Sequence, residues 1–113
     1  MNVKKLIEKL SAIPSNVEVY INVDSEESSE SGALVDVQLD GTLSSPTVSL
    51  VGKKFGGAGD INYLRGLLET YPEEAEVTIQ VDFGVVVPVY DLDVEMVDSE
   101  EPHVVVFGGF EEY

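Results

Sequence analysis

The chain contains no cysteine, and its only histidine is His103. Without cysteine it can form no disulfide, no thiolate metal site and no cysteine nucleophile. His103 follows Pro102 at the start of a predicted strand and has no patterned partner for acid-base chemistry. The serines gather in polar stretches such as 25–31, and none lies in the GxSxG motif of a nucleophilic serine. We therefore predict a protein that is not an enzyme, with no catalytic residue and no cofactor.

Basic residues and long apolar runs are also scarce. Six Lys and Arg stand against 22 Asp and Glu, so the formal net charge is −16. A protein of this charge repels nucleic acid and anionic membranes, so we expect no direct contact with either. The sequence has no run of about 18 apolar residues and no signal-peptide pattern, which predicts an intracellular protein without a membrane span.

What the sequence does contain is an internal repeat. Residues 6–24, LIEKLSAIPSNVEVYINVD, return at 64–82 as LRGLLETYPEEAEVTIQVD, with 8 identities in 19 positions at an offset of 58. Two shorter matches follow at offsets of 57 and 56, and they pair 35–39 with 92–96 and 48–52 with 104–108. The offset changes only between predicted strands, where a loop can lose a residue without disturbing strand pairing. The chain is therefore predicted to be a duplication.

Each copy of the repeat has the pattern of one helix followed by three strands. Apolar residues at the spacing i, i+3, i+4, i+7 predict a helix over about 3–12, with Asn2 as its N-cap and Pro14 beyond its end. Alternating apolar residues predict the strands, and connections this short join antiparallel neighbours. We therefore predict the α+β class: an internal duplication of an α-β-β-β unit with pseudo-twofold symmetry, two helices and one or more antiparallel sheets.

The repeat also predicts the domain organisation. We expect a first repeat at 1–52, a glycine-rich linker at 53–59 and a second, more acidic repeat at 60–113. The two repeats should share one core, because halves of about 55 residues would each be marginally stable alone. Their charges differ: residues 1–57 hold 8 acids and 5 lysines, for −3, and residues 58–113 hold 14 acids and one arginine, for −13.

The acidic residues of the second repeat form the candidate site. If Leu92 and Val94 point inward with Met96, then Asp91, Asp93 and Glu95 lie on the opposite face of their strand. Such a row of carboxylates can imitate the phosphates of nucleic acid and fill a groove of lysine and arginine on a partner. The predicted partner-binding surface comprises Glu73, Glu74, Glu76, Asp82, Asp91, Asp93, Glu95, Glu100 and Glu101.

The first repeat dilutes these charges, and the spacing does not favour a metal. In the alignment Glu95 is matched by Gln38, and Glu73 by Ser15. The residues shared by both repeats thus determine the fold, and the carboxylates are an additional feature of the second repeat. Alternate carboxylates on an extended strand stand roughly 6.5–7 Å apart, so one strand cannot enclose a cation. We predict no metal site.

A Leu-Ile-x-x-Leu helix, then a proline, then a Val-x-Val-type strand occurs at Leu6–Leu10, Pro14 and Val19–Val23. This unit, which covers most of the chain twice, resembles a pattern in short proteins of phages and other mobile elements. In size, charge and lack of cysteine the chain is also similar to acidic phage proteins that inhibit host defence, including anti-restriction and anti-CRISPR proteins that imitate DNA. The resemblance implies an inhibitor in the cytoplasm of a bacterial or archaeal host, and it carries over no functional residue.

Three functions follow from these observations. The leading hypothesis is a non-enzymatic acidic binding protein that occupies a basic, nucleic-acid-binding surface of a host-defence complex by charge mimicry. The first alternative is a small phage-type structural or accessory protein, in which Lys4, Lys5 and Lys9 of one copy contact the acidic half of another and form a homo-oligomer. The second alternative is a small-ligand binder, with tyrosines and carboxylates lining a cleft between the halves.

Overall fold

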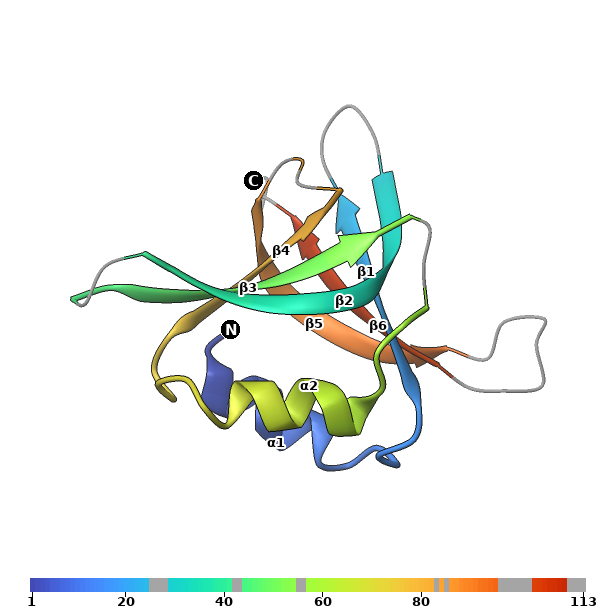
Figure 1. The fold of residues 1–113 in the computed structure, drawn as a ribbon, viewed down its shortest axis with the longest axis horizontal. Helices are drawn as coiled ribbons and strands as arrows, with labels where there is room; N and C mark the ends of the chain where they lie inside the picture. Colours follow the sequence, from blue (N-terminus) through green and yellow to red (C-terminus); the bar gives the residue numbers. More distant parts are fainter. Residues whose placement is uncertain are drawn as a thin grey trace.

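Six strands and two short helices make up the part of the chain that the structure describes. The structure is a computed structural model, and it describes residues 1–24, 29–41, 44–54, 57–82, 84, 86–95 and 103–109. In chain order the elements are α1 (Val3–Leu10), β1 (Glu18–Asp24), β2 (Ser29–Gly41), β3 (Pro46–Lys53), α2 (Ile61–Leu68), β4 (Glu76–Val81), β5 (Val87–Glu95) and β6 (His103–Gly109). Figure 1 shows the strands curving around a common interior, with both helices on one side of them.

Strands dominate the fold. They account for 55% of the structure and helices for 18%, and each helix is only 8 residues long. These proportions place the protein nearer the all-β class, so the prediction of an α+β fold built from α-β-β-β units is wrong. The helical pattern was overextended, since α1 ends at Leu10 rather than near residue 12. Neither helix in the described ranges combines the length and the apolar character that crossing a membrane requires.

The strands close into a barrel in the order β1-β2-β3-β4-β5-β6. Strands joined by short connections, such as β1 and β2 or β5 and β6, pair antiparallel. Two other pairs are parallel, β3 beside β4 and β1 beside β6. The prediction of an antiparallel sheet is therefore wrong at these two seams. The chain path explains the first, because α2 between β3 and β4 supplies the crossover that a parallel pair needs.

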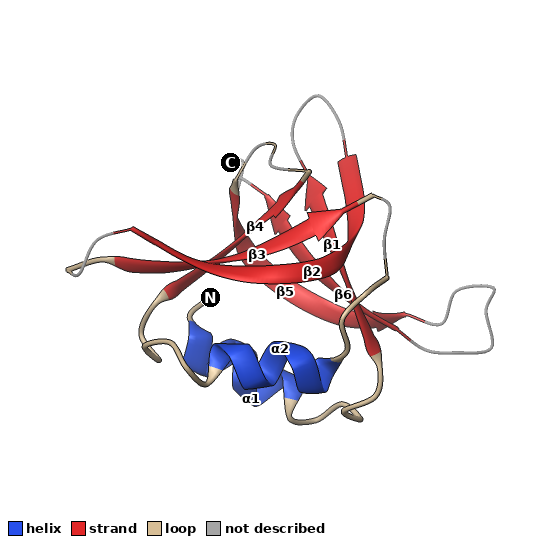
Figure 2. Ribbon diagram, in the orientation of Figure 1, coloured by secondary structure: helices blue, strands red, loops and turns tan. Residues whose placement is uncertain are grey.

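The core lies inside the barrel and beneath the two helices, which Figure 2 shows side by side. One face of each helix is fully buried: Val3, Leu6 and Leu10 on α1, and Ile61, Leu64 and Leu68 on α2. The strands contribute alternate residues to the same cluster: Val19, Ile21 and Val23 on β1, Val48 and Leu50 on β3, Val77, Ile79 and Val81 on β4, and Val104 and Val106 on β6. Burial of these apolar faces is the main favourable contribution to folding.

Each helix is attached at its start to the segment that precedes the first strand of the other half. The backbone N–H of Val3 donates to Ala75 O at 2.9 Å, and that of Ile61 donates to Val17 O at 2.9 Å. These two bonds are equivalent in the repeat, because their donors are 58 residues apart in the sequence and so are their acceptors. The return bonds are equivalent in the same way, from Val77 N to Met1 O and from Val19 N to Gly59 O. Because these bonds run in both directions, neither half completes its backbone hydrogen bonding without the other.

A β-bulge interrupts β2, and another interrupts β5 at the equivalent point. The register with the next strand shifts between Leu34 and Asp36 in β2, and between Val89 and Asp91 in β5. Leu34 stands opposite Gly52, and Val89 stands opposite Gly108. The sequence alignment of 48–52 with 104–108 already pairs these two glycines. Strands β2 and β5 are therefore equivalent at an offset of 55, and the alignment of 35–39 with 92–96 is wrong by two residues.

The far ends of β2 and β5 extend beyond the core. Val37 is buried, but Leu39 is 55% exposed and its equivalent Val94 is 44% exposed. Leu92 is half-buried, and Met96 lies outside the described residues. The prediction that Leu92 and Val94 point inward therefore fails for Val94, and Leu39 is exposed in the same way. Figure 1 shows the reason, since the β2–β3 and β5–β6 pairs project outward on opposite sides of the barrel.

Candidate functional site

The structure places the described acids of the predicted surface on separate parts of the fold. Glu73 and Glu74 are exposed in the turn before β4, and Glu76 begins that strand, whereas Asp82 follows its other end. Asp91 and Asp93 are exposed on β5. Glu95 ends β5, but its side chain lies outside the described residues together with Glu100 and Glu101. Among the described acids, Asp91 and Asp93 therefore lie together on β5, and Glu73, Glu74 and Glu76 lie together at the start of β4.

Several of these acids already have partners within the chain. Asp91 Oδ1 lies 3.4 Å from Lys9 Nζ, and Glu76 Oε2 lies 3.5 Å from the amine of Met1. Asp82 Oδ1 accepts the backbone N–H of Lys54 at 3.3 Å. Asp93 Oδ1 accepts only the neighbouring N–H of Val94 among the described residues. Among the described residues, Asp93 therefore has no ion-pair partner.

Strand β1 adds carboxylates that the sequence analysis missed. Across the sheet, Asp93 stands opposite Val105, and Val105 stands opposite Tyr20. Side chains at paired positions share a sheet face, so the outward residues of β5, β6 and β1 form one surface. Its exposed carboxylates are Glu18, Asp24, Asp91 and Asp93, which we term the acidic face. Only the parallel pairing of β1 with β6, which no local pattern indicates, brings Glu18 and Asp24 beside β5.

Two tyrosines donate hydrogen bonds to carboxylates of the acidic face. Tyr20 donates its hydroxyl to Glu18 Oε2 at 2.9 Å, and this hydrogen bond raises the pKa of Tyr20 above its usual 10.0. Tyr90 donates its hydroxyl to Asp24 Oδ2 at 3.2 Å. Its pKa is also raised, first by burial and then by the bond to Asp24. The carboxylates at both ends of β1 therefore stand in defined positions next to aromatic rings.

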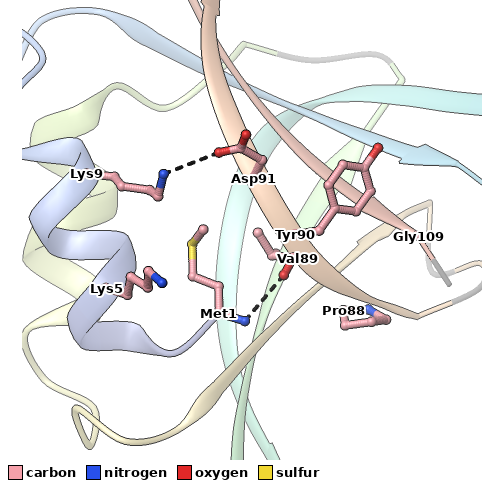
Figure 3. Close-up of a pocket in the computed structure, with 8 residues that line it drawn as sticks. All are labelled: Met1, Lys5, Lys9, Pro88, Val89, Tyr90, Asp91 and Gly109. Atoms are coloured by element: carbon pink, nitrogen blue, oxygen red, sulfur yellow. Dashed lines mark hydrogen bonds and ion pairs between the residues drawn. The ribbon is translucent and has the colours of Figure 1, made fainter. Parts of the chain in front are cut away.

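A cleft of about 650 Å³ opens between α1 and β5. It is lined by Met1, Lys5, Lys9, Pro88, Val89, Tyr90, Asp91 and Gly109. Figure 3 shows Lys5 and Lys9 on the helix side, and Val89, Tyr90 and Asp91 along β5. The Lys9–Asp91 ion pair bridges the two sides, and the Met1 amine donates to Val89 O at 3.4 Å. The cleft is therefore a polar space with two ammonium groups on its helical wall.

The ion pair and the strand backbone both act on Asp91. The backbone N–H of Leu92 donates to Asp91 Oδ1 at 2.8 Å, and this bond is the main reason that the pKa of Asp91 is lowered from 3.8. Lys9 lowers the pKa further, while partial burial opposes both effects. Asp91 therefore remains a carboxylate at neutral pH.

Within the described ranges, no group of three or more His, Asp and Glu is close enough to hold a metal ion. The side chain of His103, the histidine considered for acid-base chemistry, lies outside the described residues. Searches against protein-family models, curated proteins and solved structures found no match to this chain. The resemblance to phage proteins stays a prediction, and function is inferred from the acidic face and the cleft.

Proposed function

We propose that the chain is a non-enzymatic binding protein whose acidic face occupies a basic, nucleic-acid-binding surface of a protein partner. The observation that carries this proposal is the layout of that face. Carboxylates on β1 and β5 flank β6, whose contribution to this face is the half-buried Phe107 beside Val105, which is 8% exposed. An apolar centre with a charged rim is the usual composition of a protein–protein interface.

The dimensions of the face suit a partner that binds nucleic acid. Strands β1 and β5 lie two strand spacings apart, which is about 9–10 Å. Along β1, Glu18 and Asp24 are six residues apart, or about 20 Å in an extended strand. A groove of lysine and arginine side chains that normally contacts phosphates could contact carboxylates spread over this area. Because the barrel fixes the strands, the charges need no ordering when the partner binds.

The alternative of self-assembly has less support. It needs Lys4, Lys5 and Lys9 to contact the acidic half of another copy. Lys9 instead forms an ion pair with Asp91 of its own chain, which uses one cation and one carboxylate of that contact. We therefore expect light scattering to show a monomer at both low and high salt. Larger species that dissolve as salt rises would favour the assembly function instead.

Competition with nucleic acid tests the proposed function. The immobilised protein is exposed to a bacterial lysate, and bound proteins are eluted with duplex DNA or with salt of the same ionic strength. We expect nucleic-acid-binding proteins to be retained and to be released by DNA far better than by the matched salt. Retained proteins that DNA does not displace would show that the acidic face and nucleic acid do not share a binding surface.

A pair of charge-matched variants locates the surface. Glu18→Gln with Asp93→Asn removes two charges from the acidic face. Asp36→Asn with Asp40→Asn removes two exposed charges from β2. We expect the first pair to lose most of the retained protein and the second pair to keep it. Equal losses in both would mean that only net charge matters, and the assignment to this face would be abandoned.

A further inference from the structure

The barrel has two equivalent helix–strand contacts, α2 with β2 and α1 with β5. They differ in the side chains that lie between helix and strand. On one side, α2 and the turn that follows it place two tyrosines against β2. Tyr63 donates its hydroxyl to Val35 O at 3.2 Å, and Tyr71 donates to Val37 O at 3.4 Å. Val35 is the extra residue of the β2 bulge, so its carbonyl lies outside the regular ladder and is available to a side chain. The chain thus fills this space with its own phenol groups.

On the other side, the same positions of α1 carry different residues. At the offset of 58, Tyr63 corresponds to Lys5, Leu67 to Lys9 and Tyr71 to Ile13. None of these three residues has an aromatic ring, and the space between α1 and β5 is the cleft of about 650 Å³. Small-molecule sites in proteins typically have volumes of about 300–1,000 Å³. Tyrosine side chains bridge helix and strand in one half, and in the other half the cleft is large enough for a ligand.

The strand side of the cleft has a backbone carbonyl equivalent to the one that accepts the Tyr63 hydroxyl in the other half. At the offset of 55, Val35 corresponds to Tyr90, which is the extra residue of the β5 bulge. The backbone carbonyl of Tyr90 therefore occupies the place of the carbonyl that accepts the Tyr63 hydroxyl. A ligand with a phenol group can repeat the hydrogen bond that Tyr63 makes.

The helix side of the cleft selects the charge of the ligand. Lys9 is paired with Asp91 at 3.4 Å, whereas the described residues provide no ion-pair partner for Lys5. Lys5 is exposed and lines the cleft. An anionic group in the cleft would give Lys5 a partner, and a cationic group would meet a like charge.

From these observations we propose that the cleft between α1 and β5 binds a small aromatic carboxylate. Its ring lies in the cleft between Lys5 and β5, its hydroxyl donates to the Tyr90 carbonyl, and its carboxylate pairs with Lys5. This binding site is separate in function from the acidic face and does not depend on the protein partner proposed above.

The probe is 4-hydroxyphenylacetate, added to ¹⁵N-labelled protein and followed by NMR. We expect saturable amide shifts at residues that line the cleft, including Lys5, Val89 and Asp91. Tyramine has the same phenol ring with an aminoethyl chain in place of the carboxymethyl group. We expect it to bind at least about tenfold more weakly, because its ammonium meets the like charge of Lys5 instead of forming an ion pair. If tyramine binds as well as the acid, or if neither gives saturable shifts, the proposal is overturned.

Variants of α1 distinguish binding in the cleft from a general effect of the protein's charge. Lys5→Gln should weaken binding of 4-hydroxyphenylacetate roughly three- to fivefold, which is the effect of losing one exposed ion pair. Lys4→Gln makes the same charge change on the same helix, outside the cleft, and should leave the affinity unchanged. Lys5→Tyr restores the residue found in the other half and should abolish binding by filling the space. If Lys5→Tyr does not fold, Lys5→Gln and Lys4→Gln still decide, and equal affinities in those two overturn the proposal.

Discussion

Asp36 and Asp91 occupy equivalent places in the two halves of the barrel. Each follows the extra residue of a β-bulge, and the Oδ1 atom of each accepts the backbone N–H of the next residue at 2.8 Å. The helix beside them differs, because α1 presents Lys9 to Asp91 where α2 carries Leu67 at the corresponding position. The same local structure is thus kept in both halves, while its electrostatic surroundings have diverged.

The pKa of Asp91 can be used to separate these two influences. It should lie below 3.8 in the folded protein, mainly because the Leu92 N–H stabilises the carboxylate and secondly because Lys9 does. Lys9→Met should raise the pKa of Asp91 but leave it below 3.8. An NMR titration that follows the side-chain carboxyl carbon measures both values. A return all the way to 3.8 in Lys9→Met would show that the backbone bond is not the larger cause.

The same shift predicts a direction for stability against pH. A carboxyl whose pKa is lowered by folding stabilises the protein above its unfolded pKa, and this contribution disappears as pH falls through the lower, folded value. Asp91→Asn should therefore have a smaller loss of stability than wild type as pH is lowered from about 5 to 2. Urea unfolding at several pH values measures the difference. Parallel pH profiles for the two proteins would contradict this prediction.

Gly52 and Gly108 are equivalent glycines with unequal surroundings. A Cβ on Gly108 would lie 2.7 Å from Pro88 O and 2.6 Å from Ile79 Cδ1, whereas a Cβ on Gly52 would have no neighbour closer than 3.5 Å. We expect Gly108→Ala to reduce the free energy of unfolding by about 1–3 kcal/mol through overpacking. Gly52→Ala should be nearly neutral and serves as the control. Urea unfolding measures both, and equal effects would mean that β5 and β6 can move apart freely at this point.

The buried faces were the part of the fold that the sequence predicted well. Leu6, Leu10 and Ile21 are fully buried, as their periodicity indicated. The N-cap Asn2 was also predicted correctly, since its side chain accepts the N–H of Lys5, the third residue after it. These features depend on a few neighbouring residues along the chain, which is why local patterns reveal them.

The register of β2 and β5 could not be derived in the same way. Residues on one face of a strand recur every two positions, so an alignment that slips by two residues keeps every apolar residue on its original face. Offsets of 55 and 57 therefore fit the alternation equally well. The bulges at Val35 and Tyr90 decide between them, and a bulge has no fixed sequence signal. One consequence is that Glu95 corresponds to Asp40 rather than to Gln38.

The candidate site was only partly predictable for a related reason. The exposure of Asp91 and Asp93 followed from strand alternation, and the structure places both on the outside of β5. The contribution of Glu18 and Asp24 depends on pairing between strands more than 80 residues apart in the chain. The cleft depends on the contact of α1 with β5, which joins the two ends of the sequence. Neither long-range contact leaves a pattern in a single sequence.

Ile79 tests the central packing of the barrel. It is fully buried on β4, so Ile79→Ala should reduce the free energy of unfolding by about 2–5 kcal/mol. Val94→Ala also shortens an apolar strand residue, but Val94 is 44% exposed and its replacement should cost much less. Urea unfolding of both variants provides the comparison. A near-neutral Ile79→Ala would show that β4 does not pack in the register described.

The last prediction concerns Asp60, the N-cap of α2. Its Oδ1 atom accepts the N–H of Tyr63 at 2.8 Å, and the next residue, Ile61, donates its own N–H to Val17 O. A helix of 8 residues is marginal by itself, so it depends on its cap and on its packing. Asp60→Ala should reduce the free energy of unfolding by about 0.5–2 kcal/mol. Asn62→Ala, at an exposed position of the same turn, should be neutral or slightly stabilising because alanine has the higher helix propensity. Urea unfolding measures both changes. If the Asp60→Ala protein is as stable as Asn62→Ala, the contacts between α2 and the first half stabilise the helix without its cap.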